Sequence, residues 1–494
     1  MARINTNISS LVAQRSLAQN NTDLQMRLQR LSTGLRINRG ADDPAGLIVS
    51  ERLRSEIKGL NQAVSNSERA SSVIATTEGY LTEVSDLLNS IRGLIVEAAN
   101  TGALSQEEIE ANQLQIDSAI ESITRISNTA SFAGLQLLNG AMDYLTSGIA
   151  TSAIAGVTIQ GAQFGTASNI AVNVEVVSSA QTATLFLSGA YTDATANGTI
   201  LSTVTLEIAG TLGVQTLQFV SGTSFSDVVT AINLIKDATG VSAALASASN
   251  QSSGLNFFST GFGSSEFVSV KKIGEGGDFF SVQDSQGGTT LQRDEGRDVT
   301  AIINGALALG NGLEVSLDQP TLSLELMLTQ DFAQQTGSVK SFRITGGGAT
   351  FQLGPRITTT QQVGFGLQSV AASRVGRTMI GGTMNFLDSI RSGQTNSLLE
   401  GRAQQAASIL ENAVTEVSVL RGRLGAFERN TLQTNVRSLQ VGIENMTASE
   451  SKIRDADFAA ETAALTRAQI LAQAGTSVLA TANANAQNVL SLLG

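Results

Sequence analysis

Hydrophobic residues recur every seven positions along residues 53–95, and this spacing restricts the possible folds more than any other feature. The series runs Leu53, Leu60, Ser67, Ile74, Leu81, Leu88 and Ile95. A heptad pattern of this kind is typical of a long helix that packs along a partner helix in a coiled coil or bundle. We therefore predict one helix over about residues 44–100, roughly 85 Å long at 1.5 Å per residue.

The C-terminal part of the chain offers a partner for this helix, because its hydrophobic residues are also spaced by three and four. After Arg429 the stripe resumes one residue out of phase at Leu432, which predicts a local change in helix winding. A second N-terminal helix is expected after Ser105, which forms an S-x-x-E capping box with Glu108. We expect an intramolecular bundle in which Leu53, Leu60, Ile74, Leu81 and Leu88 pack against Val417, Leu420, Leu424 and Phe427.

Residues 141–360, between these helical ends, differ in composition. They are rich in Gly, Thr, Val and Ser and carry 8 Lys/Arg against 17 Asp/Glu, whereas the two ends together carry 23 against 25. Runs such as NIAVNVEVV and ILSTVTLEI alternate apolar and polar residues, which indicates β-strands. One short helix is predicted from Phe225 to Lys236, capped by Ser224 or Ser226. The predicted fold class is α+β: long paired N- and C-terminal helices forming a coiled-coil bundle, with a central β-rich insertion domain.

The absent residue types exclude several kinds of chemistry. The chain has no His and no Cys, so thiol nucleophiles, disulfides, zinc sites and imidazole catalysis are ruled out. The acidic residues of the middle show no evident pairing in the sequence. We therefore predict a protein that is not an enzyme, with no catalytic residues, no cofactor and no metal site.

Charge and hydrophobicity also limit the partners. A net charge of −11 argues against nucleic acid. No apolar run approaches the roughly 20 residues of a membrane span, so no membrane insertion is expected. The opening residues MARINTNISSLVAQRSL lack the continuous apolar core of a cleaved secretory signal. If the protein leaves the cell, we expect a route that needs no such signal.

The two ends of the chain carry only thin apolar stripes among Asn, Gln, Ser and Ala. Ordering a residue requires roughly 1–2 kcal/mol, and such helices bury too little apolar surface alone to offset it. Beside identical helices of neighbouring subunits, the same stripes would be buried. We therefore predict an obligately self-associating chain with the following residues buried between subunits: Ile4, Ile8, Leu11, Val489, Leu490, Leu492 and Leu493.

The stretch LQRLSTGLRINRGADDPAG, residues 28–46, interrupts the first helical pattern. Gly34 permits a turn, and Asp43 and Pro44 are suited to the N-cap and first position of the next helix. Charged residues gather here and at the corresponding C-terminal position: Arg36, Arg39, Asp42, Asp43, Arg454, Asp455 and Asp457. Two interpretations stay open. They are solvated loop charges, each worth under about 1 kcal/mol, or they form pairs between subunits.

Both ends resemble one protein family. The segments MARINTNISSLVAQRSLAQNN and LQRLSTGLRINRGADDPAG are similar to the N-terminal region of bacterial flagellins. RGRLGAFERNTLQ, IENMTASESKIRDADFAAETAALTRAQILAQAG and ANANAQNVLSLL resemble the C-terminal region of the same family. In the middle, GTSFSDVVTAINLIKDATGVSA resembles a small repeat inserted in some flagellins and hook-associated proteins, and GATFQLGPR resembles a stretch found before the C-terminal helices of some flagellins.

The resemblance implies three structural regions and a function. Residues 1–43 with 455–494 would form an inner helical layer, residues 44–145 with 362–454 a coiled-coil bundle with a small β-hairpin, and residues 146–361 the β-rich outer insertion. The chain would be a structural subunit of the extracellular flagellar filament, exported unfolded by the flagellar type III export apparatus. An export chaperone, a filament cap protein and hook-associated junction proteins would be its partners beside other copies of itself. Alternatives are a hook–filament junction protein of the same architecture, or a filament subunit whose middle acts as an adhesin.

Some flagellins are detected by a Toll-like receptor of animal hosts. The core of that contact site matches Ile91, Arg92 and Leu94. Ser90 stands where the activating flagellins carry an arginine, and Gln115 where they carry a glutamate. Because serine lacks the forked cation of arginine, the resemblance implies weakened or absent receptor activation.

Overall fold

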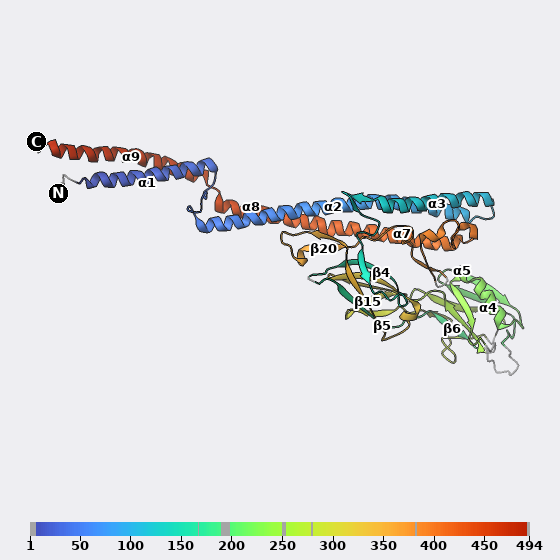
Figure 1. The fold of residues 1–494 in the computed structure, drawn as a ribbon. Helices are drawn as coiled ribbons and strands as arrows, with labels where there is room; N and C mark the ends of the chain where they lie inside the picture. The colour runs from blue at the N-terminus through green and yellow to red at the C-terminus, as the bar shows by residue number, and fades with distance from the viewer. Residues whose placement is uncertain are drawn as a thin grey trace. The chain divides into compact units, whose positions relative to one another are not determined.

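The computed structural model describes residues 6–165, 167–188, 198–248, 253–277, 280–380 and 383–491, with side chains described as far as residue 485. The chain divides into two compact units. The terminal unit consists of Met1–Ser72, Phe351–Gln362 and Gly425–Gly494, and the central unit of Val73–Thr350 and Val363–Leu424. Helices come from the two ends of the chain and strands from its middle, so the predicted α+β class is confirmed (Figure 1).

The N-terminal helices begin and end where the sequence predicts. α1 ends before Gly34, whose φ of 72° is the left-handed conformation that glycine tolerates. The Asp43 carboxylate accepts a hydrogen bond of 2.9 Å from the Gly46 amide, and α2 begins at Pro44. The Ser105–Glu108 capping box is present in both directions. The three helices are α1 (Ile8–Thr33), α2 (Pro44–Ala98) and α3 (Gln106–Thr129).

The C-terminal helices confirm the predicted change in winding. α7 (Ala403–Ala426) passes into a six-residue π-helical turn, η5 (Phe427–Leu432), before α8 (Gln433–Arg454) and α9 (Phe458–Ser491). A π-turn accommodates one extra residue in a helix. The stripe is displaced by one residue after Arg429, and Leu432 is nevertheless buried like Leu424. The π-turn therefore absorbs the phase slip that is visible in the sequence.

In the terminal unit, α1 and α9 pack as an antiparallel pair. Asn7 contacts Ala482, Asn20 contacts Leu471, and Arg27 contacts Glu461, so the partner's number falls as the chain advances. The start of α2 meets α8, where the Leu60 side chain would lie 3.8 Å from a Cβ atom added to Gly442. Asn435 of α8 donates to the Leu353 carbonyl and to the Ser67 hydroxyl, which ties residues 351–362 and α2 together.

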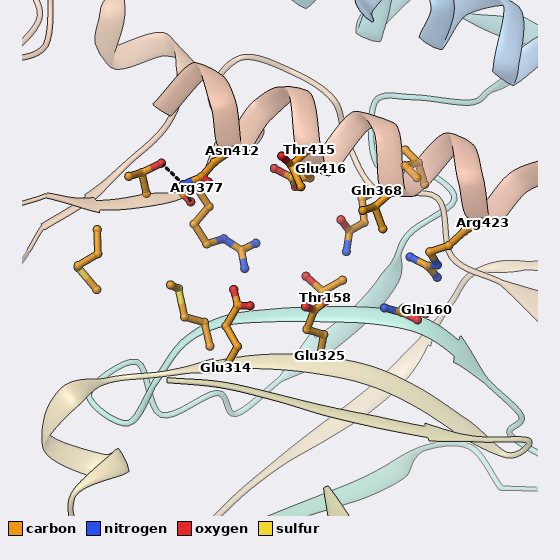
Figure 2. Close-up of a pocket in the computed structure, with 15 residues that line it drawn as sticks. Thr158, Gln160, Glu314, Glu325, Gln368, Arg377, Asn412, Thr415, Glu416 and Arg423 are labelled. Atoms are coloured by element: carbon orange, nitrogen blue, oxygen red, sulfur yellow. Dashed lines mark hydrogen bonds between the residues drawn. The ribbon is translucent and has the colours of Figure 1, made fainter. Parts of the chain in front are cut away.

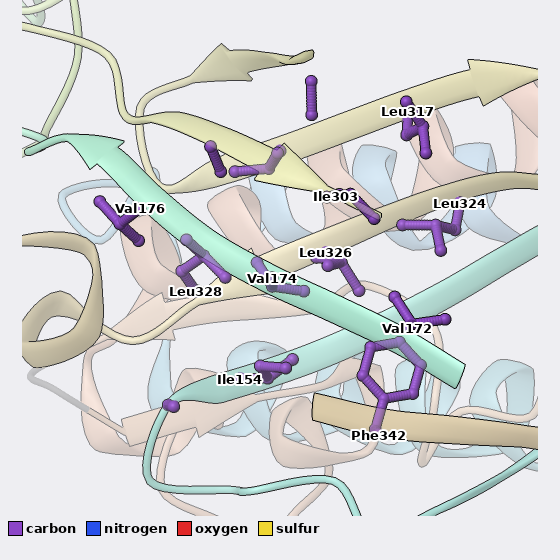
Figure 3. Packing of buried hydrophobic residues seen from close by; sticks show 14 of the residues in the cluster. Ile154, Val172, Val174, Val176, Ile303, Leu317, Leu324, Leu326, Leu328 and Phe342 are labelled. Atoms are coloured by element: carbon purple, nitrogen blue, oxygen red, sulfur yellow. The ribbon is translucent and has the colours of Figure 1, made fainter. Parts of the chain in front are cut away.

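The central unit contains the largest sheet. Eight antiparallel strands follow the order β3-β18-β5-β14-β15-β16-β17-β4. Their inward residues, among them Val174, Leu326 and Phe342, form one apolar core (Figure 3). A short helix, α6 (Gln330–Ala333), follows β17. The strands are β3 (Tyr144–Ser147), β4 (Ile154–Ala162), β5 (Ile170–Ser178), β14 (Thr300–Ile303), β15 (Ala306–Asn311), β16 (Glu314–Gln319), β17 (Leu322–Leu328) and β18 (Val339–Gly347).

A second module is inserted between β5 and β14. It holds two four-stranded sheets, β12-β6-β10-β9 and β13-β11-β7-β8, around its own apolar core. The chain enters and leaves at neighbouring points, because Gln181 and Arg297 exchange two backbone hydrogen bonds of 2.9 Å. The strands are β6 (Thr184–Leu187), β7 (Val204–Gly210), β8 (Val214–Phe219), β9 (Val241–Leu245), β10 (Leu255–Ser259), β11 (Phe267–Ile273), β12 (Val282–Gln283) and β13 (Arg293–Glu295).

The predicted short helix of this module is divided into two. α4 (Phe225–Leu234) is capped by the Ser224 hydroxyl, and α5 (Lys236–Thr239) ends at Gly240 in the left-handed conformation. The remaining strands form three two-stranded sheets, and short 3₁₀ helices occur in the connections. These elements are β1 (Ser131–Phe132) with β2 (Leu135–Gln136), β19 (Ala349–Gln352) with β20 (Gln362–Phe365), β21 (Thr378–Ile380) with β22 (Thr383–Asn385), and η2 (Thr359–Gln361), η3 (Leu387–Ile390) and η4 (Leu398–Glu400).

Candidate subunit interface

The terminal helices leave a set of large apolar side chains in solvent. Ile8 and Leu11 of α1 are 58 % and 60 % exposed, although α1 already packs against α9. A row of unburied aliphatic side chains on a paired helix is typical of a surface that binds another protein. We call the following eight residues the terminal apolar surface: Ile8, Leu11, Val12 and Leu28 of α1, and Phe458, Ile470, Leu471 and Val478 of α9.

Five predicted interface residues cannot be placed on this surface. Ile4, Leu492 and Leu493 lie outside the described residues. Val489 and Leu490 lie in α9, but their side chains are outside the described part of the chain. The prediction that these residues are buried between subunits therefore stays a prediction, as it does for Ile8 and Leu11.

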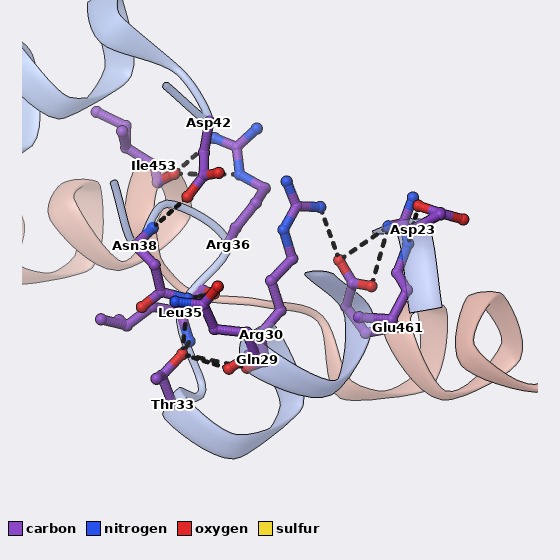
Figure 4. A network of polar contacts seen from close by, with 11 residues as sticks. Asp23, Gln29, Arg30, Thr33, Leu35, Arg36, Asn38, Asp42, Ile453 and Glu461 are labelled. Atoms are coloured by element: carbon purple, nitrogen blue, oxygen red, sulfur yellow. Dashed lines mark hydrogen bonds and ion pairs between the residues drawn. The ribbon is translucent and has the colours of Figure 1, made fainter. Parts of the chain in front are cut away.

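Polar contacts set the register of α1 against α9. The Asn7 side-chain amide donates to the Ala482 carbonyl at 3.0 Å, and the Ser10 hydroxyl donates to the Asn483 side chain at 2.8 Å. Near the other end of the pair, Arg27 and Arg30 each reach the Glu461 carboxylate at 3.0 Å (Figure 4). Glu461 is only 7 % exposed. Because a buried carboxylate is stable only when it is paired, this contact selects one register of the two helices.

The two arginines control the ionisation of Glu461. Burial by itself favours the neutral acid, but the hydrogen bonds from Arg27 and Arg30 and their positive charges outweigh it and hold the pKa of Glu461 below its ordinary value of 4.5. A lowered pKa in the folded state means that the pair stabilises the fold above the unfolded pKa. That stabilisation is lost as the pH falls through the folded pKa.

Glu461→Gln is therefore expected to weaken the α1–α9 pair by about 1–3 kcal/mol at neutral pH, because two arginines lose their anionic partner. The variant should also lose part of the chain's sensitivity to acid below about pH 4.5. Hydrogen exchange of the α1 and α9 amides at pH 7 and pH 4 measures both effects. Asp23→Asn is the matched control, since Asp23 contacts Arg27 from a half-exposed position; equal effects of the two variants would contradict the assignment.

The charged residues of the junction are engaged within the chain. Arg36 donates to the Ile453 carbonyl, and the Asp42 carboxylate accepts from the Asn38 amide (Figure 4). The Asp42 carboxylate also accepts from the Arg39 amide. These backbone hydrogen bonds lower the pKa of Asp42 from its ordinary value of 3.8. The Leu35 backbone forms an isolated β-bridge with Asp455. Residues 34–43 are thus held against the end of α8 by main-chain contacts.

The other junction charges also have partners in the terminal unit. Arg454 forms an ion pair of 2.8 Å with Glu51, and the Arg39 guanidinium donates to the Gln29 side chain. The Asp455 carboxylate accepts from the Ser451 hydroxyl, and the Asp457 carboxylate accepts from the Ala459 amide at the start of α9. Each group of this set thus has an intramolecular partner, but Arg36, Arg39, Asp455 and Asp457 are exposed, so the interpretation as solvated loop charges stays open. Their predicted pairing between subunits stays a prediction.

The predicted bundle residues are mostly buried. Leu53 and Phe427 are half-buried, and the Phe427 ring centre lies 6.2 Å from that of Phe351. The others are buried: Leu60, Ile74, Leu81, Leu88, Val417, Leu420 and Leu424. Their pairing across specific helices stays a prediction.

The residues matched to the host receptor site differ in exposure. Arg92 is exposed, Leu94 is half-buried, and both Ser90 and Gln115 are exposed. The Ile91 side chain has an exposed fraction of 0 %. Ile91 is therefore not available at the surface, because α2 directs it into the core of the central unit.

The structure brings together charged residues that appear scattered in the sequence. A cleft of about 340 Å³ lies between α7 and strands β4, β16 and β17 (Figure 2). Glu314 and Glu325 point into it from the β16–β17 hairpin, Glu416 from α7, and Arg377 and Arg423 from its two sides. The absence of pairing among the acids of the middle, expected from the sequence, is therefore wrong for this hairpin. Side chains alternate along both strands of the hairpin, and this alternation places both glutamates on one face. The alternation is the sequence signal from which their proximity can be predicted.

Burial raises the pKa of Glu416 above its ordinary 4.5, although the Gly376 amide donates to its carboxylate at 2.9 Å and Arg377 is near. Burial also raises the pKa of Glu314, and the neighbouring charge of Glu325 adds to this effect. A raised folded-state pKa means that folding favours the protonated acid. The associated stabilisation is complete below the unfolded pKa and is lost as the pH rises through the folded pKa.

Glu416→Gln is accordingly expected to raise the stability of the chain at pH 7, by on the order of 1 kcal/mol, since glutamine keeps the acceptor for Gly376 and carries no buried charge. Thermal unfolding at pH 7 and pH 4 measures the effect, which should shrink at pH 4. The exposed Glu295→Gln serves as control and should change neither value. A destabilised Glu416→Gln at pH 7 would show that the ionised carboxylate is needed.

Among residues whose placement is described, no group of three or more acidic side chains is arranged to hold a metal ion. No helix within the described ranges is both long and apolar enough to cross a membrane.

Comparison with known proteins identifies both ends of the chain. The models of the bacterial flagellin N-terminal and C-terminal helical regions match residues 4–143 and 407–493. The flagellin hook IN motif matches residues 205–261, which confirms the predicted inserted repeat. The flagellin of Salmonella rubislaw is 30 % identical over 519 residues, and the B-type flagellin of Pseudomonas aeruginosa is 31 % identical over 549 residues. In both comparisons, 99 % of each chain is covered.

The solved structure of FliC from Burkholderia pseudomallei is also similar, with 15 % identity over 74 % of this chain and 99 % of that one. Its TM-score of 0.23 is too low to bear on the arrangement of the elements. The identity over whole chains is what decides the assignment. The chain belongs to the bacterial flagellin family, whose members are structural subunits of the flagellar filament and not enzymes.

Proposed function

We propose that this chain polymerises into the flagellar filament by burying its terminal apolar surface between copies of itself. The observation that carries the proposal is the exposure of large aliphatic side chains on helices that are already paired, with Ile8 and Leu11 about three-fifths exposed. Polar contacts hold α1 against α9, and the aliphatic side chains of the terminal apolar surface are left exposed for contact with a second copy. Burial of such side chains contributes about 1.5–3 kcal/mol for each one that becomes fully covered.

We further propose that three regions of the chain occupy three different layers of the filament. Residues 1–43 with 455–494 form the inner layer of the filament, residues 44–145 with 362–454 form the bundle around it, and residues 146–361 face outward. The junction at residues 34–43 and 454–457 supports the first of these boundaries, because helices end on both sides of it. The acidic balance of residues 141–360 suits an outer surface, since a net charge keeps a solvent-exposed surface soluble.

The export route and the assembly partners form the last part of the proposal. The chain leaves the cell unfolded through the flagellar type III export apparatus, with an export chaperone on its C-terminal segment. It is then inserted beneath a filament cap protein and follows hook-associated junction proteins. Family membership supports these assignments.

Seeded polymerisation tests the central claim. Full-length monomer incubated with short filament fragments should grow into long helical filaments, seen by electron microscopy. A chain that stops after a few added subunits would instead be a junction protein of the same architecture. A chain that adds to no seed would refute the proposal.

The adhesin alternative concerns the inserted module alone. Filaments of the full chain and of a variant without the module can be compared on glycan arrays. Binding that disappears with the module would favour an adhesin.

For the host receptor, we propose weakened or absent activation, because Ser90 stands where the activating flagellins carry an arginine and Gln115 where they carry a glutamate. A reporter-cell assay of depolymerised protein with full potency would contradict it.

A further inference from the structure

The inserted module has one sheet edge that is not protected. β8 is the terminal strand of the sheet β13-β11-β7-β8, and within the described residues it pairs with β7 alone. The strand at the opposite edge of this sheet, β13, carries the charged residues Arg293, Asp294 and Glu295. The edge strand β9 of the companion sheet is blocked, because the Asn233 side chain exchanges two hydrogen bonds with the Ala243 backbone.

β8 lacks the usual protective features of an edge strand. No charged residue and no proline stand between Glu207 and Asp227. The register of β8 with β7 is regular from Val214 to Phe219, without a bulge. Val214 is 56 % exposed and Val220, directly after the strand, is 62 % exposed. Natural sheets place charges, prolines or bulges on such edges, and an uncharged straight edge with exposed aliphatic side chains is a site of strand addition.

The ladder with β7 defines which backbone groups are available. The Gly210 amide donates to the Gly213 carbonyl at the turn, so hydrogen-bonded pairs alternate from there. Gln215, Leu217 and Phe219 then direct their amides and carbonyls to β7. Val214, Thr216 and Gln218 direct theirs to the open side of the sheet.

We propose that β8 pairs antiparallel with β8 of a second copy of this chain. Only one register uses all three available residues of both strands: Thr216 faces Thr216 on a two-fold axis, and Val214 faces Gln218. Because this axis is perpendicular to the sheet, the exposed faces of the two copies lie on one side and their core faces on the other. One continuous sheet then runs through both modules. A strand without charge meets its own copy without repulsion.

The symmetry of this contact separates it from growth of the filament. A helical polymer is built from head-to-tail contacts, whereas a β8–β8 contact is isologous and closes after two copies. A β8–β8 contact therefore joins one subunit to one other copy and does not continue along the helix of the polymer. In a filament such a contact would be a lateral connection. The inference goes beyond the proposed assembly through the terminal helices and does not rest on it.

Cysteine crosslinking tests the register directly, because the chain contains no cysteine. In a hydrogen-bonded antiparallel pair the facing Cα atoms lie about 5.5 Å apart, within the range that a disulfide spans. Full-length Thr216→Cys, kept as unseeded monomer, is expected to form covalent dimers under mild oxidation. The control is Ser316→Cys, which is exposed on β16 but paired on both sides, with Leu309 of β15 and Glu325 of β17; it should crosslink at least about tenfold more slowly.

A charge on the axis provides the second test. In Thr216→Lys two ammonium groups face each other, so the dissociation constant of the dimer should rise about tenfold or more. Analytical ultracentrifugation measures this constant, with Ser316→Lys as control. Equal crosslinking of the two cysteine variants, a purely monomeric parent chain, or a dimer indifferent to Thr216→Lys would each overturn the proposal. In the last case the edge would be free to accept a strand from another protein.

Discussion

Filament growth is expected to be abolished when residues 1–35 are removed, while the central unit keeps its fold. The deletion takes away α1 and with it half of the terminal apolar surface. It also leaves the buried Glu461 without Arg27 and Arg30, so the remaining α9 loses its only described ion-pair partners. The central unit contains none of these residues. Seeded polymerisation followed by electron microscopy should show no growth, with an unchanged unfolding transition of the central unit by circular dichroism. Removal of residues 455–494 should give the same result.

A deletion elsewhere in the chain supplies the control. Residues 182–296 can be replaced by an Asn-Gly turn, because Gln181 and Arg297 already face each other through two backbone hydrogen bonds. The strands β5 and β14 are paired in the native sheet and would become a hairpin. This variant loses far more residues than the N-terminal truncation, and we expect it to polymerise. Normal filaments from either terminal truncation would refute the assembly mechanism.

Two single-residue deletions in the C-terminal helices should differ strongly in their effect on the stability of the fold. Deleting Asn430 removes one exposed residue from the π-turn, where the Gln433 amide bonds to the Glu428 carbonyl five residues back. The turn can then close as a regular α-helix, and we expect a stability change within about 1 kcal/mol. Deleting the exposed Ser418 from α7 instead rotates all later residues by about 100°.

The rotation moves Leu420 and Leu424 out of the core of the central unit. Each is buried, and loss of a buried leucine from its site typically costs about 2–5 kcal/mol, so the Ser418 deletion should unfold at a much lower temperature. Thermal unfolding followed by circular dichroism distinguishes the two variants. Similar melting temperatures would contradict the view that the π-turn exists to absorb one extra residue.

Local features of the fold could be predicted from the sequence because their signals lie within a few residues. Asp43 before Pro44 and the Ser105–Glu108 box each act over a single turn. The phase slip after Arg429 is also local, since it is a count along one helix.

Features that depend on distant partners could not be predicted in the same way. Glu461 meets Arg27 across a separation of 434 residues, and no periodicity records such a contact. The cleft likewise joins Glu314 of a β-hairpin to Glu416 of a late helix. The sequence shows the junction charges as a group. Their partners are mainly backbone groups, which composition and spacing do not identify. The burial of Ile91 could have been predicted, because Ile91 stands three residues after Leu88 and four before Ile95 and so belongs to the buried stripe of the heptad pattern.

The pairing of α1 with α9 has a consequence for chains that are made incompletely. Asn7 and Ala482 are separated by 475 residues, so the first helix acquires its partner only when nearly the whole polypeptide is present. A product that ends early, through interrupted translation or proteolysis, keeps α1 but lacks the groups that fix its register. Under the proposed assembly through the terminal helices, such an incomplete copy would be left out of the polymer, and assembly itself would select complete chains.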